Sequence, residues 1–365
     1  MSGQAGDFGD LRLRQVRDGL HDIGLNGLLV TRPAGVRYLS GFSGSSALLL
    51  VQPGVATLVT DFRYATQAAA EVNPGIGVVV ADDELFTSLA RILEGGGPGR
   101  RFGFDESILS VGDRRALGEA CPDVSWEPAA RLVAELRARK SHDEVSRVEE
   151  AVRVAEAALE AVLPVVEEGM TERQLAAELE FRLRMAGSEA IPFETIVASG
   201  PRTALPHARP GDRRLAEGDL LLIDFGAVVH GYCSDITRTF TLGPATPWQA
   251  AIHEAVREAL NAALGLVASG RKARDVDQGA RFVLEEKGLA ERFGHGTGHG
   301  VGLEVHEPPR LNRRSRDVLQ TGNVVTIEPG VYLPERGGVR LEEVVVVEPA
   351  AGRVLTRFSL DLAEL

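Results

Sequence analysis

Apolar and polar positions alternate in short blocks along the first 135 or so residues of the chain. An amphipathic segment with helical periodicity, LRLRQVRDGLHDIG (11–24), comes first. It is followed by short apolar runs that are typical of strands: GLLVT, SALLLV, VATLVTD, GVVVA and FGFD. Apolar strands interspersed with amphipathic segments predict a small α/β domain here.

The pattern changes close to Lys140. The segment LVAELRARK (132–140) is helical and basic, and Ser141 with Glu144 then forms the S-x-x-E pattern of a capping box. This pattern marks the start of a new helix. We therefore predict a first domain over residues 1–140, including a linker helix, and a second domain over residues 141–365.

Four helices are expected in the second domain. Apolar residues recur at helical spacing from Val145 to Val162, and Pro164 ends that run. A second capping pattern, from Thr171 to Gln174, opens a helix that is expected to end near Gly187. The segments WQAAIHEAVREALNAALGLV and VDQGARFVLEEKG predict two further helices, which alternate with strand-like runs.

Two of the strand-like runs resemble each other. LLLIDFG and VVTIEPG each place a carboxylate, Asp224 or Glu328, inside an apolar run, with glycine two positions later. Each is followed by a second strand-like run that carries another carboxylate, Asp235 or Glu342. This repetition suggests a diverged internal duplication of a helix pair and a hairpin.

The four carboxylates are expected to come together. Asp224 lies in a run so apolar that an isolated charge there is costly unless it is paired or metal-bound. Asp235 follows eleven positions later across a predicted hairpin, so strand pairing brings both carboxylates to one point. Glu328 and Glu342, fourteen positions apart, allow the same geometry.

The ordinary alternative for each carboxylate is an ion pair with an arginine such as Arg238 or Arg340. Two arginines cannot neutralise four buried carboxylates, whereas two divalent cations carry four positive charges. With one added histidine, the set is rich in oxygen and suits manganese, cobalt, iron or zinc. It predicts a two-metal hydrolytic site, in which the ions activate water and stabilise the developing oxyanion.

The histidine is expected from FGHGTGHGVGLEVHE (293–307). Its glycine spacing fits neither G-x-G-x-x-G nor a phosphate-binding G-x-x-x-x-G-K motif, and no lysine follows. Glycines on both sides of His299 permit close backbone approach and unusual backbone dihedrals. A histidine in a glycine turn is more often structural, but here the neighbouring carboxylate pattern favours a metal ligand.

Composition excludes several classes of function. Fifty-two acidic against 40 basic residues give a net charge of −12, and no basic run indicates a nucleic-acid partner. The N-terminus lacks the pattern of a secretory signal, and no apolar run is long enough to span a membrane. Cys121 and Cys233 are far apart, which argues against a disulfide framework or a cysteine-rich zinc site. We expect a cytoplasmic protein.

Over nearly its whole length the chain resembles the metallopeptidase family of the Xaa-Pro peptidases (prolidases and aminopeptidases P) and, more distantly, the methionine aminopeptidases. YLSGFSGS and VTDFRYATQA resemble the N-terminal domain of the proline-specific branch. The resemblance implies an α/β creatinase-type domain followed by an α+β pita-bread catalytic domain with internal pseudo-duplication. In the second domain the matching motifs, in the family's order, are PHARP (206–210), IDFGAVVHGYCSDITRTF (223–240), HGTGHGVGLEVHEPP (295–309), IEPGVY (327–332) and VRLEE (339–343).

Carried over by position, the resemblance implies a dinuclear metal centre with manganese, cobalt or zinc. Its five ligands are Asp224, Asp235, His299, Glu328 and Glu342. Asp235 and Glu342 bridge both ions in this pattern. Asp224 completes the shell of one ion, and His299 and Glu328 complete that of the other.

The resemblance also implies roles in catalysis and substrate binding. Glu328 is the general base, while His207 and His306 share two tasks: proton delivery to the leaving proline nitrogen and a hydrogen bond to the developing oxyanion. Which histidine does which stays open. His295 lies near the proline pocket and Arg340 steadies the bridging carboxylates, with a scaffolding role for both as the alternative. Cys233 is left out of the site.

The expected reaction is hydrolysis of the bond between an N-terminal residue and a following proline, in Xaa-Pro dipeptides or longer peptides. Arg37 or the loop 41–46 is a candidate to close the site behind the proline carboxylate; otherwise Arg37 is an exposed arginine at the start of a strand. The alternatives are a creatinase-like amidinohydrolase, whose relatives have lost metal ligands that this chain keeps, and a non-catalytic pita-bread interaction module. Neither a nucleic acid nor a membrane is an expected partner, and a homodimer is expected because relatives are often dimers.

Overall fold

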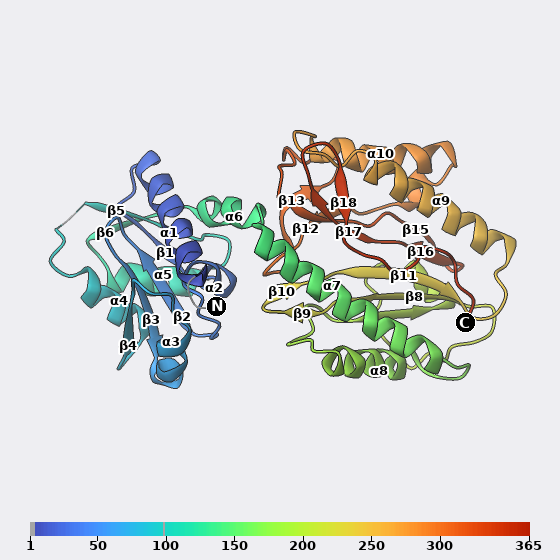
Figure 1. Cartoon of the computed structure of the whole chain (residues 1–365), viewed down its shortest axis with the longest axis horizontal. Coiled ribbons are helices and arrows are strands. Elements are labelled where there is room, and N and C mark those ends of the chain that lie inside the picture. The colour runs from blue at the N-terminus through green and yellow to red at the C-terminus, as the bar shows by residue number, and fades with distance from the viewer. Residues whose placement is uncertain (1–3, 98) are drawn as a thin grey trace. The chain divides into compact units, whose positions relative to one another are not determined.

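The computed structural model describes residues 4–97 and 99–365, with side chains from residue 11 onward. Residues 1–3, on which the expectation of no secretory signal partly rests, lie outside this range. The chain divides into two compact units, Met1–Arg137 and Ala138–Leu365 (Figure 1). None of the helices in the described ranges is long and apolar enough to cross a membrane.

The first unit is built on a six-stranded mixed sheet with the strand order β4-β3-β2-β1-β5-β6. Strands β1, β2 and β3 pair antiparallel, and β4, β5 and β6 join in parallel. The strands are β1 (Gly27–Val30), β2 (Ala47–Val51), β3 (Ala56–Asp61), β4 (Ile76–Ala81), β5 (Arg100–Phe104) and β6 (Val124–Pro128). The helices are α1 (Gln4–Asp22), α2 (Pro33–Ser40), α3 (Ala65–Glu71), α4 (Leu85–Leu93), α5 (Val111–Ala120) and α6 (Ala130–Ala138). The predicted α/β domain is confirmed.

One prediction in the first unit is wrong. Arg37 does not start a strand, because it lies in the last turn of helix α2 and is half-buried. Pro33 at the first turn and Gly41, whose φ of 80° closes the C-terminus in the left-handed conformation, define this short helix. The proline that starts this helix and the glycine that ends it can both be seen in the sequence, but the helix between them is too short to show a clear periodicity.

The four helices predicted for the second unit are confirmed. Both predicted capping boxes form, Ser141 with Glu144 and Thr171 with Gln174. Pro164 falls in a short 3-10 turn directly after the first helix, as expected from its missing N–H group. The helices are α7 (His142–Val162), α8 (Glu172–Met185), α9 (Pro247–Leu264) and α10 (Ala273–Glu286).

Two sheets lie between the helix pairs. The smaller has the order β11-β8-β7 and the larger β13-β12-β14-β17-β18, and two short hairpins, β9–β10 and β15–β16, extend from them. The strands are β7 (Ile196–Ser199), β8 (Leu220–Phe225), β9 (Val228–Val229), β10 (Tyr232–Cys233), β11 (Ile236–Thr241), β12 (Gly298–Gly300), β13 (Glu307–Leu311), β14 (Val324–Ile327), β15 (Gly330–Leu333), β16 (Gly337–Arg340), β17 (Glu343–Val347) and β18 (Gly352–Val354).

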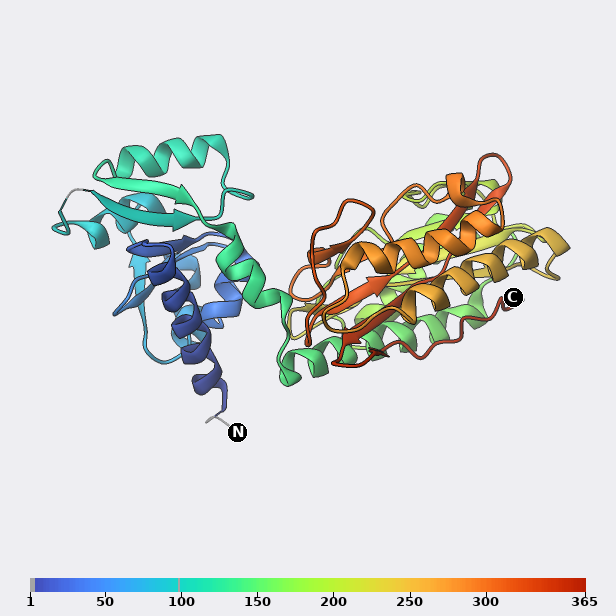
Figure 2. The same ribbon diagram turned by 90° about the horizontal axis from the view of Figure 1, so that it is seen from above.

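Successive side chains of a strand point to opposite faces of the sheet, and this shows how the layers pack. In β17, Val344 and Val346 join the apolar core under α7 and α8, while Val345 and Val347 join the core under α9 and α10. Helices α7 and α8 therefore cover one face of the sheets and α9 and α10 the other (Figures 1 and 2). Each half contributes one helix pair and one hairpin, β8 with β11 or β14 with β17, which agrees with the predicted internal duplication.

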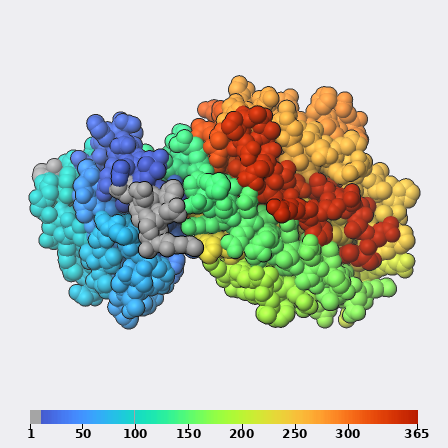
Figure 3. Space-filling model, viewed as in Figure 1, coloured from blue at the N-terminus to red at the C-terminus, as the bar shows by residue number. Residues whose placement is uncertain are grey.

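The C-terminal segment lies on the surface of the second unit, where the space-filling view shows it in red between α7 and α9 (Figure 3). Glu156 on α7 accepts a hydrogen bond of 2.7 Å from Phe358 N. Leu365 N donates to Thr241 O at 2.9 Å, at the end of β11. The last residues thus fasten α7 to the strand that follows Asp235.

Candidate metal centre

The four predicted carboxylates stand at the ends of paired strands. Asp224 lies near the end of β8 and pairs with Thr237, so Asp235, two residues before Thr237, is on the same face. Glu328 directly follows β14, and Glu342 directly precedes β17. The two hairpins therefore bring their carboxylates to one place, as the spacing predicted.

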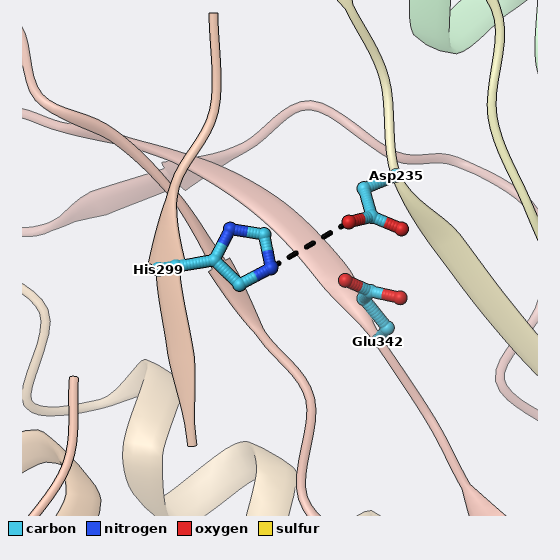
Figure 4. A group of neighbouring side chains, drawn as sticks. All are labelled: Asp235, His299 and Glu342. Atoms are coloured by element: carbon cyan, nitrogen blue, oxygen red, sulfur yellow. Dashed lines mark ion pairs between the residues drawn. The ribbon is translucent and has the colours of Figure 1, made fainter. Parts of the chain in front are cut away.

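His299 completes the cluster from strand β12. Asp235, His299 and Glu342 each offer one ligand atom, and these atoms lie within 4.8 Å of one another. His299 Nε2 is 3.6 Å from Asp235 Oδ2 and 3.4 Å from Glu328 Oε1. Figure 4 shows the imidazole directed at Asp235, with the Glu342 carboxylate beside that of Asp235.

A cavity of about 690 Å³ opens onto this cluster. Every site residue predicted in the second domain lines it, whereas Arg37 belongs to the other unit. Phe193, Ile196 and Val305 add an apolar part to the wall. The predicted site residues among its lining are His207, Asp224, Asp235, His295, His299, His306, Glu328, Arg340 and Glu342.

The protein atoms alone leave the carboxylates poorly compensated. Burial, followed by repulsion from neighbouring carboxylates, raises the pKa values of Asp235 and Glu342 well above their usual range. Burial also raises the pKa of Glu328 to about 7, although the charge of Arg340 opposes this. Clustered carboxylates of this kind require cations nearby to remain ionised.

Unpartnered oxygen atoms support the same conclusion. Asp224 Oδ1 and Glu342 Oε1 are buried and have no hydrogen-bond partner among the described residues. The other Glu342 oxygen accepts from Thr237 Oγ1 at 2.8 Å. Four carboxylates, two of which have a free buried oxygen, and one imidazole form a donor set that fits divalent cations.

The alternative considered above, an ion pair between a carboxylate and an arginine, is found at Asp224. Arg340 Nη2 forms an ion pair with Asp224 Oδ2. Arg238 instead pairs with Glu343 at 3.0 Å and donates to Phe358 O at 2.9 Å. Arg340 is thus the arginine at the cluster, and it cannot neutralise four carboxylates.

Tyr332 links Arg340 to His295, a role that the sequence did not reveal. Arg340 Nη1 donates to Tyr332 Oη at 3.0 Å, and this hydroxyl lies 2.8 Å from His295 Nε2. His295 Nδ1 lies 2.8 Å from Gly296 O, which can only accept, so Nδ1 carries the hydrogen and Nε2 accepts from tyrosine. Burial, followed by the charge of Arg340, lowers the pKa of His295 to about 4, so its ring is neutral.

The glycines beside His299 are needed for close packing. A Cβ atom at Gly298 would lie 1.9 Å from Thr326 O, and one at Gly300 would lie 2.2 Å from Pro308 O. Neither glycine has a positive φ, so the expectation of unusual dihedrals is wrong. Close contact with strands β13 and β14, rather than backbone strain, demands glycine at these two positions.

The two remaining histidines lie at the cavity wall. The His306 ring packs against His299 with ring centroids 4.3 Å apart, and burial lowers the pKa of His306 to about 4. His207 is exposed in the loop after the short helix η3 (Gly200–Ala204).

Arg310 also lines the cavity and was missed in the sequence, although it lies only four residues after His306. Among the described residues, no ion pair engages the Arg310 side chain.

Arg37 and Cys233 have other surroundings. Burial raises the pKa of Glu71, but hydrogen bonds from Ser43 and Gln67 outweigh it, and the pKa is lowered overall. The charge of Arg37 also lowers this pKa, so Arg37 lies near the Glu71 carboxylate. Cys233 is buried in the core beneath α7 and α8. Its backbone N–H donates to Gly302 O at 2.7 Å. This buried position agrees with leaving Cys233 out of the site.

Comparison with known proteins identifies two families along the chain. Residues 146–349 match the model of metallopeptidase family M24, and residues 12–139 match the creatinase/prolidase N-terminal domain. A curated Xaa-Pro dipeptidase from Pyrococcus horikoshii is 34% identical over 358 residues, covering 98% of this chain and 99% of the relative. These matches confirm the resemblance seen in the sequence.

Solved structures agree. An Xaa-Pro dipeptidase from Bacillus anthracis matches with a TM-score of 0.93 and 35% identity, covering 98% of this chain and all of the other. An X-Pro aminopeptidase from Thermotoga maritima matches with a TM-score of 0.89 and 32% identity, covering 97% and 99%. A creatinase-type domain followed by a pita-bread catalytic domain is therefore confirmed as the fold. The chain belongs to metallopeptidase family M24 and is a hydrolase.

Proposed function

We propose that the protein cleaves the bond between an N-terminal residue and a following proline, at a centre that holds two divalent ions. The observation that carries this proposal is the convergence of four carboxylates and His299 in one cavity, with buried oxygens left unpartnered. The names of the relatives supply the preference for proline. Manganese, cobalt or zinc suits the donor set, which consists of Asp224, Asp235, His299, Glu328 and Glu342.

Divalent ions at this position supply Lewis-acid activation of water and of the scissile carbonyl. Glu328, at the edge of the cluster, is the candidate general base that accepts the proton of the attacking water. The nitrogen of a peptide bond before proline carries no hydrogen, so it must gain a proton as it leaves. His207 and His306 face the same cavity, and one donates that proton while the other hydrogen-bonds the carbonyl oxygen.

The cavity wall provides for binding of the proline residue. Its apolar part, Phe193, Ile196 and Val305, suits an aliphatic ring. His295 and Arg340 form part of the polar wall beside the carboxylates, and Tyr332, which does not line the cavity, links these two side chains. Because His295 is neutral and fixed by two hydrogen bonds, it can shape the pocket without adding a charge.

Two arginines are candidates for the carboxylate of a dipeptide. Arg37 remains the candidate from the sequence, and Arg310 is a second one that lines the cavity itself. Arg209, another arginine of the wall, is already paired with Glu194 at 3.1 Å. An arginine that receives the substrate carboxylate favours dipeptides, because a longer peptide has no charge at that position.

A peptide panel tests the reaction. Metal-stripped protein is incubated with Ala-Pro, Ala-Pro-Ala and Ala-Ala-Ala, with and without manganese, cobalt or zinc, and released amino acids are quantified. We expect cleavage only with metal and only before proline, and the ratio of Ala-Pro to Ala-Pro-Ala turnover separates a prolidase from an aminopeptidase P. If all three peptides stay intact while metal is bound, a creatinase-like amidinohydrolase or a non-catalytic module replaces the proposal.

Three further properties belong to the proposal. We place the domain division at Lys140, with residues 1–140 as the creatinase-like domain and linker helix and 141–365 as the metallopeptidase domain.

We expect a homodimer in the cytoplasm that acts on Xaa-Pro dipeptides or proline-containing peptides. Light scattering of the purified protein checks the dimer, for which a mass of two 39.0 kDa chains is the expected result.

A further inference from the structure

The loop that carries His207 runs from the end of β7 to the start of β8. The His207 ring is exposed, so its position in the cavity follows from the course of this backbone. The loop follows Ser199 and includes Gly211, and both of these residues approach the first turn of α8. What fixes this loop therefore fixes His207.

Glu172, the first residue of helix α8, fastens the start of the loop and its middle, on either side of His207. Its side chain is fully buried. Glu172 Oε1 accepts from Ser199 N at 2.9 Å and from Ser199 Oγ at 3.0 Å. Glu172 Oε2 accepts from Gly211 N at 3.0 Å. One buried carboxylate thus holds together the segment 199–211, which contains His207, and backbone bonds from Glu172 N to Arg213 O at 3.0 Å and Arg173 N to Gly211 O at 3.1 Å reinforce it.

Arg202 completes the attachment from inside the loop. Its Nε donates to Glu172 Oε2 at 2.9 Å, and its Nη2 donates to Arg209 O at 2.6 Å. On the other side of His207, Arg340 Nη1 donates to Pro206 O at 3.2 Å. The carbonyls on both flanks of His207 are therefore held by guanidinium groups, one anchored on Glu172 and the other on Asp224.

We propose that Glu172 and Arg202 are positioning residues that hold His207 at the cavity. Neither residue lines the cavity, so they act through the loop. This inference rests on the proposed function for its kinetic part, in which His207 serves the leaving nitrogen or the carbonyl oxygen. Its structural part, the fastening of the loop, can be measured independently of activity.

A double-mutant cycle tests the kinetic part. Arg202→Met removes the hydrogen bonds to Glu172 and Arg209, and we expect kcat with Ala-Pro to fall roughly tenfold to a hundredfold, because small displacements of a catalytic group are costly. In a His207→Ala background, Arg202→Met should lower kcat no further, whereas losses that multiply would show that Arg202 acts elsewhere. Arg202→Lys keeps a charge beside Glu172 and should retain more activity than Arg202→Met.

The control variant is Arg182→Met. Arg182 pairs with Glu178 on the same helix α8, and its side chain is 34% exposed, as is that of Arg202. Its removal should leave kcat and KM unchanged. A similar loss of kcat in Arg182→Met would mean that the effect of Arg202→Met is not specific to the loop, and it would overturn the proposal.

Hydrogen exchange tests the structural part without any substrate. In Arg202→Met, amide exchange in the segment 199–211 should accelerate, while exchange in α8 beyond its first turn should match the parent. Unchanged exchange in 199–211 would overturn the proposal. If the parent does not cleave Ala-Pro at all, the proposed function fails, and the exchange result still decides whether Glu172 and Arg202 hold the loop.

Discussion

Tyr332 is a single residue on which two buried polar groups depend. Its hydroxyl accepts from Arg340 and donates to His295 Nε2. We expect Tyr332→Phe to lower the free energy of unfolding by about 1–3 kcal/mol, because His295 Nε2 is left without its partner. Urea denaturation of both proteins measures this difference. Equal stabilities would show that the hydrogen bond from Tyr332 to His295 does not stabilise the fold.

His253 on α9 makes stability depend on pH. Its side chain is buried, its Nε2 has no hydrogen-bond partner among the described residues, and burial followed by the charge of Arg257 lowers its pKa to about 4. Because the folded protein binds this proton less tightly than the unfolded chain, the contribution is complete above pH 6.5 and declines as pH falls towards 4. The loss amounts to at most about 3 kcal/mol.

Urea unfolding of the parent and of His253→Leu, each at pH 8 and at pH 5, checks this prediction. The parent should lose more stability between the two conditions than the variant, since leucine does not titrate. Identical pH dependence in the two proteins would show that His253 is not the group responsible.

For single residues, the sequence was most informative about the candidate metal ligands and least informative about the side chains that hold the site in place. Asp224 and Glu328 stand out because each interrupts an apolar run, which local pattern reveals. Tyr332 and Glu172 do not stand out, because their partners lie 37 residues away at His295 and 27 at Ser199. Contacts of this kind depend on the completed fold.

Among the elements, the junction before α7 is fastened by a buried ion pair. Lys140 Nζ lies 2.9 Å from Glu307 Oε2, and the two side chains are only 1% and 2% exposed. Glu307 begins β13 and directly follows His306, so the pair ties the start of the second unit to a wall of the cavity.

We expect Lys140→Met to cost about 3–5 kcal/mol of stability, because the buried Glu307 loses its lysine. The double variant Lys140→Met/Glu307→Leu should recover most of this loss. Lys287→Met, which removes a more exposed pair with Glu258, serves as the control and should change stability by about 1 kcal/mol or less. Urea denaturation would contradict the prediction if both lysine variants behaved alike.

Element prediction succeeded where caps and periodicity coincide, as in α7 and α8, and failed where too few buried apolar residues mark an element. Strand β6 was not predicted, because its only buried apolar residues are Val124 and Trp126, two positions apart, and Pro128 follows. Its place at the edge of the sheet, beside β5, explains how so weak a pattern still forms a strand.

For the whole molecule, metal should act as a stabilising ligand. Without metal, burial raises the pKa values of Asp235, Glu328 and Glu342, so these groups are costly to ionise in the folded protein, and a divalent ion that binds the folded state alone offsets this cost. At a thousandfold excess over Kd one such ion adds about 4 kcal/mol. Thermal denaturation should show a rise in Tm when manganese is added to the parent and a much smaller rise for Asp235→Asn.

Anomalous diffraction from crystals of manganese-loaded protein tests the central claim most directly. Two anomalous peaks per chain, enclosed by Asp224, Asp235, His299, Glu328 and Glu342, are the result that a dinuclear centre predicts. A single peak would contradict the two-ion centre. Peaks elsewhere, with Arg340 still the cation bound to Asp224 in an otherwise empty cluster, would contradict the assignment of these five ligands.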